Sequence, residues 1–302
     1  MEMMILLAVI AAAAILMMRH GKSKPAGERV SAVPVPEKKN AMPRELTQRV
    51  EEFMQYDRFS LVIQPMVNLS TNTSNGGVVL SRLNHPERGV IFPNDFLPCI
   101  EAAGLESKFD RYIFRKTCAW LSRSLAAGET VECISCNFSR KTLSEPDIVP
   151  QLLQITDSFS FPCEKLGIEI TERDKEMDSR QFLENLKRLK EAGFRIILDD
   201  CGIGVTSVKD LPNYPLDVVK IDRSILCAAD TEQKKSAYRA LVSMAAELGL
   251  KVVCKGIETE AQDAFARDVG CNYGQGFLYF TPMDVDKMFQ EIEKSRVAED
   301  AV

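Results

Sequence analysis

The chain alternates short apolar segments rich in β-branched residues with longer segments of helical periodicity, and this alternation constrains its fold more than any other feature. Continuous apolar strands that alternate with helices indicate a mostly parallel sheet covered on both faces. Eight such units in roughly 240 residues fit a (β/α)8 barrel. The alternative is an open doubly wound sheet, but the chain has no Gly-rich phosphate loop. The strand-like segments are residues 60–67, 77–83, 131–137, 166–171, 195–199, 217–221, 251–255 and 274–280.

Two of the intervening segments show helical stripes that end at a glycine. The first stripe consists of Phe182, Leu183, Leu186 and Leu189 and is followed by Gly193. The second consists of Ala237, Leu241, Met244, Ala245 and Leu248 and is followed by Gly249. Because glycine tolerates the left-handed conformation, it commonly ends a helix at this position.

The amino-terminal segment has a different character. The run from Met3 to Met18 is uncharged, near the short end of the roughly 17–25 residues that span a bilayer. Basic residues follow directly, beginning with Arg19, and place that side in the cytoplasm. A cleaved signal peptide or an interfacial helix is the alternative, but the segment lacks a basic start and a small-residue cleavage site. We therefore expect a transmembrane anchor over residues 1–18.

The remaining chain divides by composition. Residues 19–43 are rich in proline and charge and form a cytoplasmic linker. Residues 44–58 form a linking helix with Leu46, Val50 and Phe53 on one face. Residues 59–290 form the barrel, and residues 291–302 form a flexible tail.

Charge and histidine content exclude two classes of function. The 38 basic and 43 acidic residues give a net charge of −5, which argues against nucleic-acid binding through a basic surface. The only two histidines, His20 and His85, make a histidine-based zinc centre unsuitable.

Polar residues follow or end several of the strand-like segments. Active sites of barrels lie at the carboxyl ends of the strands, so these side chains are expected to meet. Three carboxylates and an asparagine at such ends suit a hard cation such as Mg²⁺. Taken singly, each Asp or Asn also fits a turn-capping role, but their shared position favours a site. In chain order they are Arg82, Asn137, Glu169, Asp199, Asp200, Lys220, Lys255 and Gln275.

Eight sequence segments between Phe59 and Met283 carry a resemblance to a known family. They are IQPMVNLS (63–70), SRLNHPERGVIFPNDF (81–96), CNFS (136–139), GIEITE (167–172), LDDCGIGVTSV (198–208), VKIDRS (219–224), KGIET (255–259) and GQGFLYFTPM (274–283). In the same order they resemble the motifs of EAL domains, which are barrel-type phosphodiesterases that hydrolyse cyclic di-GMP. The resemblance implies a (β/α)8-like barrel whose first strand runs against the others.

The resemblance also implies a two-metal hydrolysis in which the metals activate a water for attack on a phosphodiester. The matching metal-ligand positions are Asn137, Glu169, Asp199 and Asp200. Lys220 matches the catalytic lysine, and Glu172 matches the glutamate that steadies the loop after the Asp pair. The positions expected to bind the nucleotide are Gln64, Arg82, Asn137, Asp222 and Gln275.

Two departures from the family pattern bear on activity. The signature Glu-Ala-Leu of the family falls on Val78, Val79 and Leu80, so one metal ligand is missing. The general-base glutamate falls on Lys255, which can neither accept a proton from water nor bind a cation. We therefore predict a degenerate member without phosphodiesterase activity and without a cofactor, with Mg²⁺ or Mn²⁺ bound only if the remnant site still holds metal.

Three functions follow from this interpretation. The first is a membrane-anchored regulator that binds cyclic di-GMP without hydrolysis. The second is a protein-interaction regulator that no longer needs the nucleotide, and the third is a weak phosphodiesterase. The expected location is the bacterial inner membrane, with a single span and the barrel in the cytoplasm. The expected partners are cyclic di-GMP, a signalling protein and the membrane, with no nucleic acid, and the sequence leaves open whether the protein is a homodimer.

Overall fold

The computed structural model describes residues 38–171, 179–202 and 211–299. Among these residues, no helix combines the length and apolar character that a membrane crossing requires. The predicted transmembrane anchor over residues 1–18 and most of the predicted linker lie outside the described residues.

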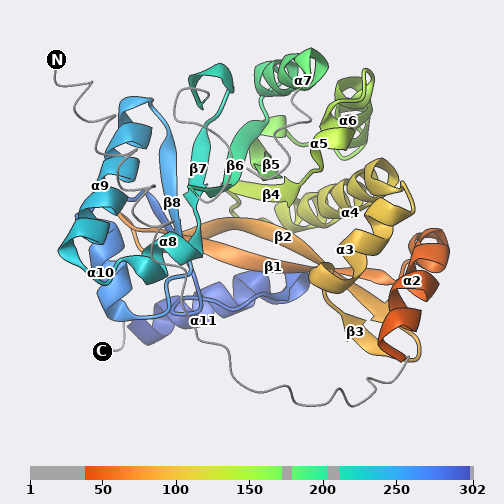
Figure 1. The fold of residues 1–302 in the computed structure, drawn as a ribbon, viewed down its shortest axis with the longest axis horizontal. Coiled ribbons are helices and arrows are strands. Elements are labelled where there is room, and N and C mark those ends of the chain that lie inside the picture. The colour runs from red at the N-terminus through yellow and green to blue at the C-terminus, as the bar shows by residue number, and fades with distance from the viewer. Residues whose placement is uncertain (1–37, 172–178, 203–210, 300–302) are drawn as a thin grey trace, which may run out of the picture.

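Eight strands form a closed barrel, which confirms the predicted fold class (Figure 1). Each strand pairs with the next, and the last pairs with the first to close the ring. In order around the barrel they are β1 (Phe59–Asn68), β2 (Thr73–His85), β4 (Cys133–Asn137), β5 (Leu166–Thr171), β6 (Arg195–Cys201), β7 (Val218–Ile221), β8 (Lys251–Lys255) and β9 (Tyr273–Gln275).

The first strand runs against its neighbours, as the resemblance implies. β1 pairs antiparallel with β2 in a long hairpin and antiparallel with β9, in which Val67 lies opposite Gly274. All other barrel pairings, from β2 round to β9, are parallel. The carboxyl ends of these parallel strands therefore meet at one end of the barrel, which we call the mouth.

Helices are arranged around the outside of the strands (Figure 1). They are α2 (Lys38–Gln55), α3 (Pro93–Ala102), α4 (Glu106–Ala126), α5 (Arg140–Leu143), α6 (Ile148–Asp157), α7 (Arg180–Glu191), α8 (Arg223–Ala228), α9 (Glu232–Glu247), α10 (Glu260–Asp268) and α11 (Met288–Glu299). A continuous apolar core fills the space between strands and helices. A second, smaller apolar layer lies inside the barrel and consists of Ile197, Val218, Val253 and Tyr273, with Met66 packed against it.

The two helical stripes predicted from sequence differ in outcome. In α7 the predicted Phe182, Leu186 and Leu189 are fully buried. In α9 the predicted Ala245 is buried, and the predicted Leu241 and Met244 are partly buried against the core. The other buried residues of α9, Tyr238 and Val242, were not predicted, and the Tyr238 hydroxyl donates to Cys254 Sγ at 2.9 Å.

The helix before the barrel begins earlier than predicted, and the helix after the barrel continues into the predicted tail. α2 begins at Lys38, inside the predicted linker, and its buried face includes the predicted Leu46 and Val50. α11 continues to Glu299, where a flexible tail from residue 291 was expected. Its start is anchored, because Met288 is fully buried and Phe289 stacks on Trp120 with ring centroids 6.1 Å apart.

Three strand details differ from the sequence expectation. Two short strands were not predicted: β3 (Gly89–Ile91), which pairs with the end of β2, and β10 (Met283–Asp284), which pairs with β1. The last predicted strand, residues 274–280, is a strand only as far as Gln275. The strand ends before Gly276, which passes so close to the backbone of Ile257 that a Cβ there would lie 2.0 Å from the Ile257 carbonyl oxygen.

Candidate functional site

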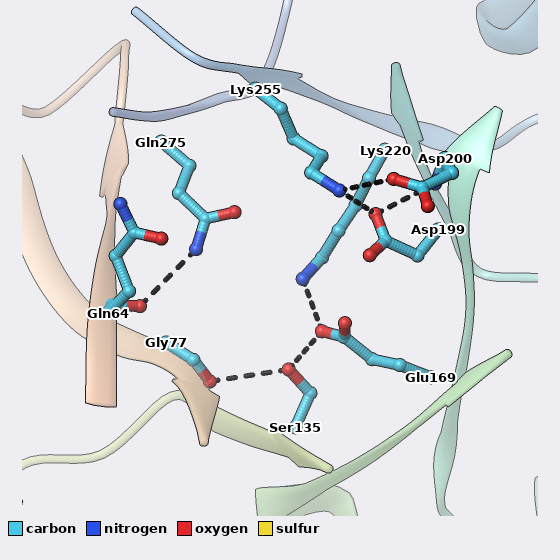
Figure 2. Close-up of polar contacts among 9 residues, drawn as sticks. All are labelled: Gln64, Gly77, Ser135, Glu169, Asp199, Asp200, Lys220, Lys255 and Gln275. Carbon is cyan, nitrogen blue, oxygen red and sulfur yellow. Dashed lines mark hydrogen bonds and ion pairs between the residues drawn. The ribbon is translucent and has the colours of Figure 1, made fainter. Parts of the chain in front are cut away.

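The candidate site lies directly above the apolar layer inside the barrel. Side chains alternate between the two faces of a strand, so the residue two positions after each layer residue also points inward. Asp199 follows Ile197, Lys220 follows Val218, and the same step leads from the layer to Lys255 and Gln275. We call the resulting group the mouth site (Figure 2): Gln64, Ser135, Glu169, Asp199, Asp200, Lys220, Lys255 and Gln275.

The deeper half of the mouth site is a buried ion pair. The Lys220 ammonium donates to Glu169 Oε1, and both side chains are only 1% exposed. Ser135 also donates to Glu169 Oε1 and lies 3.3 Å from the Gly77 carbonyl oxygen. Glu169 Oε2 is buried and accepts no hydrogen bond from the described residues. The Glu169 side chain is therefore paired with a lysine through one oxygen, and its other oxygen has no partner in the described part of the chain.

The outer half is built on Lys255 at the end of β8. Its ammonium donates to Asp199 Oδ1 at 2.6 Å and to Asp200 Oδ1 at 2.8 Å. Asp200 has a positive φ of 55°, an unusual backbone conformation for a non-glycine residue, and its own N–H donates to Asp199 Oδ1 at 2.8 Å. This turn brings both carboxylates toward one cation, whereas a regular strand would point them to opposite faces.

The charges of this cluster reinforce one another. Burial alone would raise the pKa of Asp199, but the positive charges of Lys220 and Lys255 outweigh it and lower that pKa below its usual value. Burial likewise acts to lower the pKa of Lys255, but Asp199 and Asp200 raise it well above its usual value. Asp199 and Lys255 are therefore both held in their ionised forms near neutral pH.

Asp222 lies beside this cluster at the start of α8. Its Oδ1 accepts from the Ser224 N–H at 2.8 Å and so caps the helix. Burial opposes ionisation, but the bonds from Ser224 and the charge of Lys255 lower the pKa of Asp222 below its usual value. The side chain thus has a structural task within the chain, in addition to the nucleotide contact expected from the resemblance.

Gln64 and Gln275 form the opposite wall of the mouth site (Figure 2). Gln275 Nε2 lies 3.4 Å from the Gln64 carbonyl oxygen, and Gln64 Nε2 lies 3.4 Å from the Phe280 carbonyl oxygen. Gln275 is buried, and its main-chain carbonyl oxygen accepts from the Gly256 N–H at 2.7 Å. At 3.4 Å, the two side-chain contacts of Gln64 and Gln275 are longer than typical N–H···O hydrogen bonds and are therefore weak.

The other predicted residues do not take part in the ion pairs of Lys220 and Lys255. Asn137 is exposed at the end of β4, and Arg82 contacts the Ser81 carbonyl oxygen and the Phe92 ring. Val78 is buried and pairs with Gln64 and Ser135 in the sheet register. The predicted loop residue Glu172 lies outside the described residues.

The mouth site does not fit a divalent metal as it stands. Lys255 already occupies one oxygen of each aspartate, and Lys220 occupies the glutamate. Within residues 38–171, 179–202 and 211–299, no group of three His, Cys, Asp or Glu side chains is placed to hold a metal ion. A cation would have to displace an ammonium that is already well bonded to two carboxylates.

One member of the mouth site, Ser135, was missed at the sequence level. It lies two residues before Asn137 on β4, so strand alternation places both on the inner face. Strand alternation counted back from Asn137 is therefore the sequence signal that identifies Ser135.

Comparisons with known proteins agree with this architecture. The family model described as "EAL domain" matches residues 47–282. Cyclic di-GMP phosphodiesterase NbdA of Pseudomonas aeruginosa is 28% identical over 240 residues, which make up 79% of this chain and 31% of that protein. The bifunctional diguanylate cyclase/cyclic di-GMP phosphodiesterase MucR of the same bacterium is 30% identical over 257 residues, which make up 84% of this chain and 38% of that protein. The chain thus spans well under half the length of these two relatives.

Among solved structures, the PaMucR phosphodiesterase in complex with c-di-GMP is similar in both fold and sequence. It superimposes with a TM-score of 0.75 and 29% sequence identity, covering 81% of this chain and 99% of that chain.

Proposed function

Since the chain belongs to the EAL domain family, we propose that it is a regulator in cyclic di-GMP signalling that binds cyclic di-GMP without hydrolysing it. Such a regulator would serve pathways of the motility or biofilm type. The names of the relatives and the c-di-GMP complex of PaMucR support the ligand. The bonds from Lys255 to Asp199 and Asp200 carry the second half of the proposal.

The bonds of Lys255 bear on both requirements of hydrolysis. In the resemblance described above, the two aspartates bind metal and position 255 holds the general base. An ammonium there satisfies the aspartates by a charge-assisted hydrogen bond but cannot take a proton from water. Loss of a general base typically costs a factor of about 10²–10⁴ in rate. Loss of the metal removes the activated nucleophile as well.

Val78 also supports the proposal that the protein does not hydrolyse cyclic di-GMP. Its side chain is 5% exposed and faces Ser135 across the β2–β4 pairing. A valine has no oxygen to offer a cation, at the position where the family signature has a glutamate. The two departures therefore remove a ligand and a base from one site.

Binding of the nucleotide depends on different groups. Gln64, Asn137 and Gln275 lie at or near the mouth, and Arg82 has no carboxylate partner among the described residues. An arginine can bind a phosphate through two parallel hydrogen bonds, and this contact needs no metal. The loss of the metal therefore leaves an anion contact in place.

We further propose that residues 1–18 anchor the protein in the bacterial inner membrane with the barrel in the cytoplasm. The uncharged run from Met3 to Met18 and the basic residues after it support this topology. Alkaline extraction of membranes tests it, because an anchored chain stays in the pellet. Release of the full-length chain into the supernatant would refute the anchor.

The central proposal is tested by calorimetry of the full-length protein with cyclic di-GMP in EDTA. Micromolar binding is expected, together with no turnover when Mg²⁺ or Mn²⁺ replaces the EDTA. Turnover that Asp199→Asn abolishes would instead establish a weak phosphodiesterase. No binding at high nucleotide concentration would favour a nucleotide-independent regulator that acts through a protein partner.

A gain-of-function double variant provides a second test of the proposed inactivity. The double variant Val78→Glu, Lys255→Glu supplies an acid at both departing positions, and we expect it to acquire Mg²⁺-dependent hydrolysis. Lys251→Glu is the matched control, because it reverses a charge at the opposite end of the same strand. Equal activity in the double variant and the control would show that these two positions do not decide hydrolysis.

A further inference from the structure

The short strand β3 brings an exposed aromatic side chain to the mouth. β3 pairs antiparallel with β2, with Leu83 opposite Ile91. Continuing this register by one residue places Phe92 opposite Arg82. Residues directly opposite each other on an antiparallel pair present their side chains on the same face. The Arg82 guanidinium carbon accordingly lies 4.9 Å from the centroid of the Phe92 ring.

The backbone fixes where the Phe92 ring lies. Phe92 is extended, with φ −89° and ψ 160°, at the amino-terminal end of α3. Pro93 follows and restricts the preceding residue to extended conformations. The Phe92 carbonyl oxygen accepts from the Asp95 N–H at 3.0 Å, so both sides of the residue are held.

Core packing does not explain a phenylalanine at this place. The Phe92 side chain is 54% exposed, so it gains little from burial. Its specific contact is the Arg82 guanidinium, whose carbon lies over the ring, and such a cation–π contact attracts the cation to this position.

Most N–H groups of the Arg82 guanidinium have no acceptor among the described residues. One Nη donates to the Ser81 carbonyl oxygen at 2.9 Å, and no carboxylate pairs with the guanidinium in the described part of the chain. A guanidinium whose carbon lies over a ring still has N–H groups that can point away from the ring. The guanidinium edge has the planar fork that matches two oxygens of a phosphate.

We propose that Phe92 is a positioning residue that holds Arg82 with its donor edge toward a phosphodiester group of the bound nucleotide. The inference rests on the proposed binding of cyclic di-GMP and identifies a determinant of it directly after β3, outside the mouth site. Phe92 acts through the arginine, and its ring need not touch the ligand.

Calorimetry of full-length variants with cyclic di-GMP in EDTA tests the proposal. Phe92→Ala and Phe92→Leu are both expected to raise the Kd by about 3- to 5-fold, the scale of an exposed cation–π contact. Phe92→Trp keeps a ring and is expected to retain wild-type affinity. Val90→Ala is the matched control, because Val90 is equally exposed, lies two residues before Phe92 and pairs with Asn84 rather than Arg82, and the Kd of this variant should not change.

A double-mutant cycle separates positioning from a direct role. Arg82→Ala is expected to weaken binding more than Phe92→Ala, and adding Phe92→Ala to it should have no further effect. An undiminished effect of Phe92→Ala in the Arg82→Ala background would overturn the inference. Wild-type affinity in Phe92→Leu would also overturn it, while leaving the proposed function intact. No binding by the wild-type protein would overturn the proposed function and this inference with it.

Discussion

Replacing Lys255 by methionine tests the electrostatic account of the mouth site most directly. Methionine keeps the length and apolar stem of the side chain but removes the ammonium that bonds to Asp199 and Asp200. The two carboxylates then lose the ammonium that they share, while the positive charge of Lys220 still acts on Asp199. We expect a clear loss of stability at neutral pH.

The size of the loss follows from the exposure of the partners. Removing one partner of a fully buried ion pair costs about 3–5 kcal/mol, and breaking an exposed pair costs about 0–1 kcal/mol. The Lys255 side chain is 21% exposed and Asp199 is 15% exposed, so the pair lies between these limits. We expect the free energy of unfolding to fall by about 2–3 kcal/mol.

The pH dependence of this loss is also defined. The pKa of Asp199 is lowered in the folded protein, so its contribution is present above the unfolded value of about 3.9 and is lost as the pH falls through the folded value. The pKa of Lys255 is raised, so its contribution persists up to alkaline pH. The difference between wild type and variant should be constant from about pH 5 to 9 and shrink below about pH 4.

Urea unfolding at a series of pH values measures this difference, with Lys141→Met as the control. Lys141 pairs with Glu106 at 3.0 Å but is 48% exposed, so its loss should cost less than about 1 kcal/mol. Addition of Mg²⁺ should stabilise Lys255→Met more than wild type, because two carboxylates become available. Equal unfolding midpoints for Lys255→Met and Lys141→Met, or an equal response of wild type to Mg²⁺, would refute the reasoning.

Three further variants probe the surrounding structure by urea unfolding. Burial raises the pKa of Asp110 to about 6, so the stability of the wild type relative to Asp110→Asn should fall by on the order of 3 kcal/mol as the pH rises from about 4 to 6. Gly276→Ala should destabilise strongly at every pH, because its Cβ would lie 2.0 Å from the Ile257 carbonyl oxygen, and a wild-type midpoint would contradict this. Ser135→Ala removes a hydrogen bond to the charged Glu169 and should cost about 1.5–3 kcal/mol; a smaller change would mean that Lys220 alone satisfies that oxygen.

The barrel could be predicted because its signals are long and repeated. Most of the predicted strand segments lie within a strand of the barrel, since buried parallel strands are nearly continuous apolar runs. β3 and β10 could not be predicted, because three residues and two residues carry no periodicity and form strands only through their partners. The turn at Gly276 depends on a loop crossing between distant segments, which is likewise invisible in a local pattern.

For the candidate site, the grouping of residues could be predicted from the sequence, but their pairing could not. Asp199, Lys220 and Lys255 could be grouped because parallel strands end at one edge, and the structure joins Lys255 to the aspartate. Which carboxylate each lysine binds could not be predicted. The bond from Lys220 to Glu169 depends on the register of the strands and on the lengths of the two side chains. The contact of Arg82 with an aromatic ring depends on a strand that sequence patterns do not reveal.

The position of β1 has a consequence for synthesis of the chain. β1 and β2 can pair as a hairpin as soon as both have left the ribosome, but the other edge of β1 pairs with β9 and β10. These partners follow about 200 residues later, which is on the order of 10–40 s at ordinary translation rates. During that interval one edge of the hairpin is unpaired and its apolar residues are uncovered, a state that invites aggregation. Nascent chains of this protein should therefore depend on chaperones until the final strand emerges, more than a fold with only local pairings would.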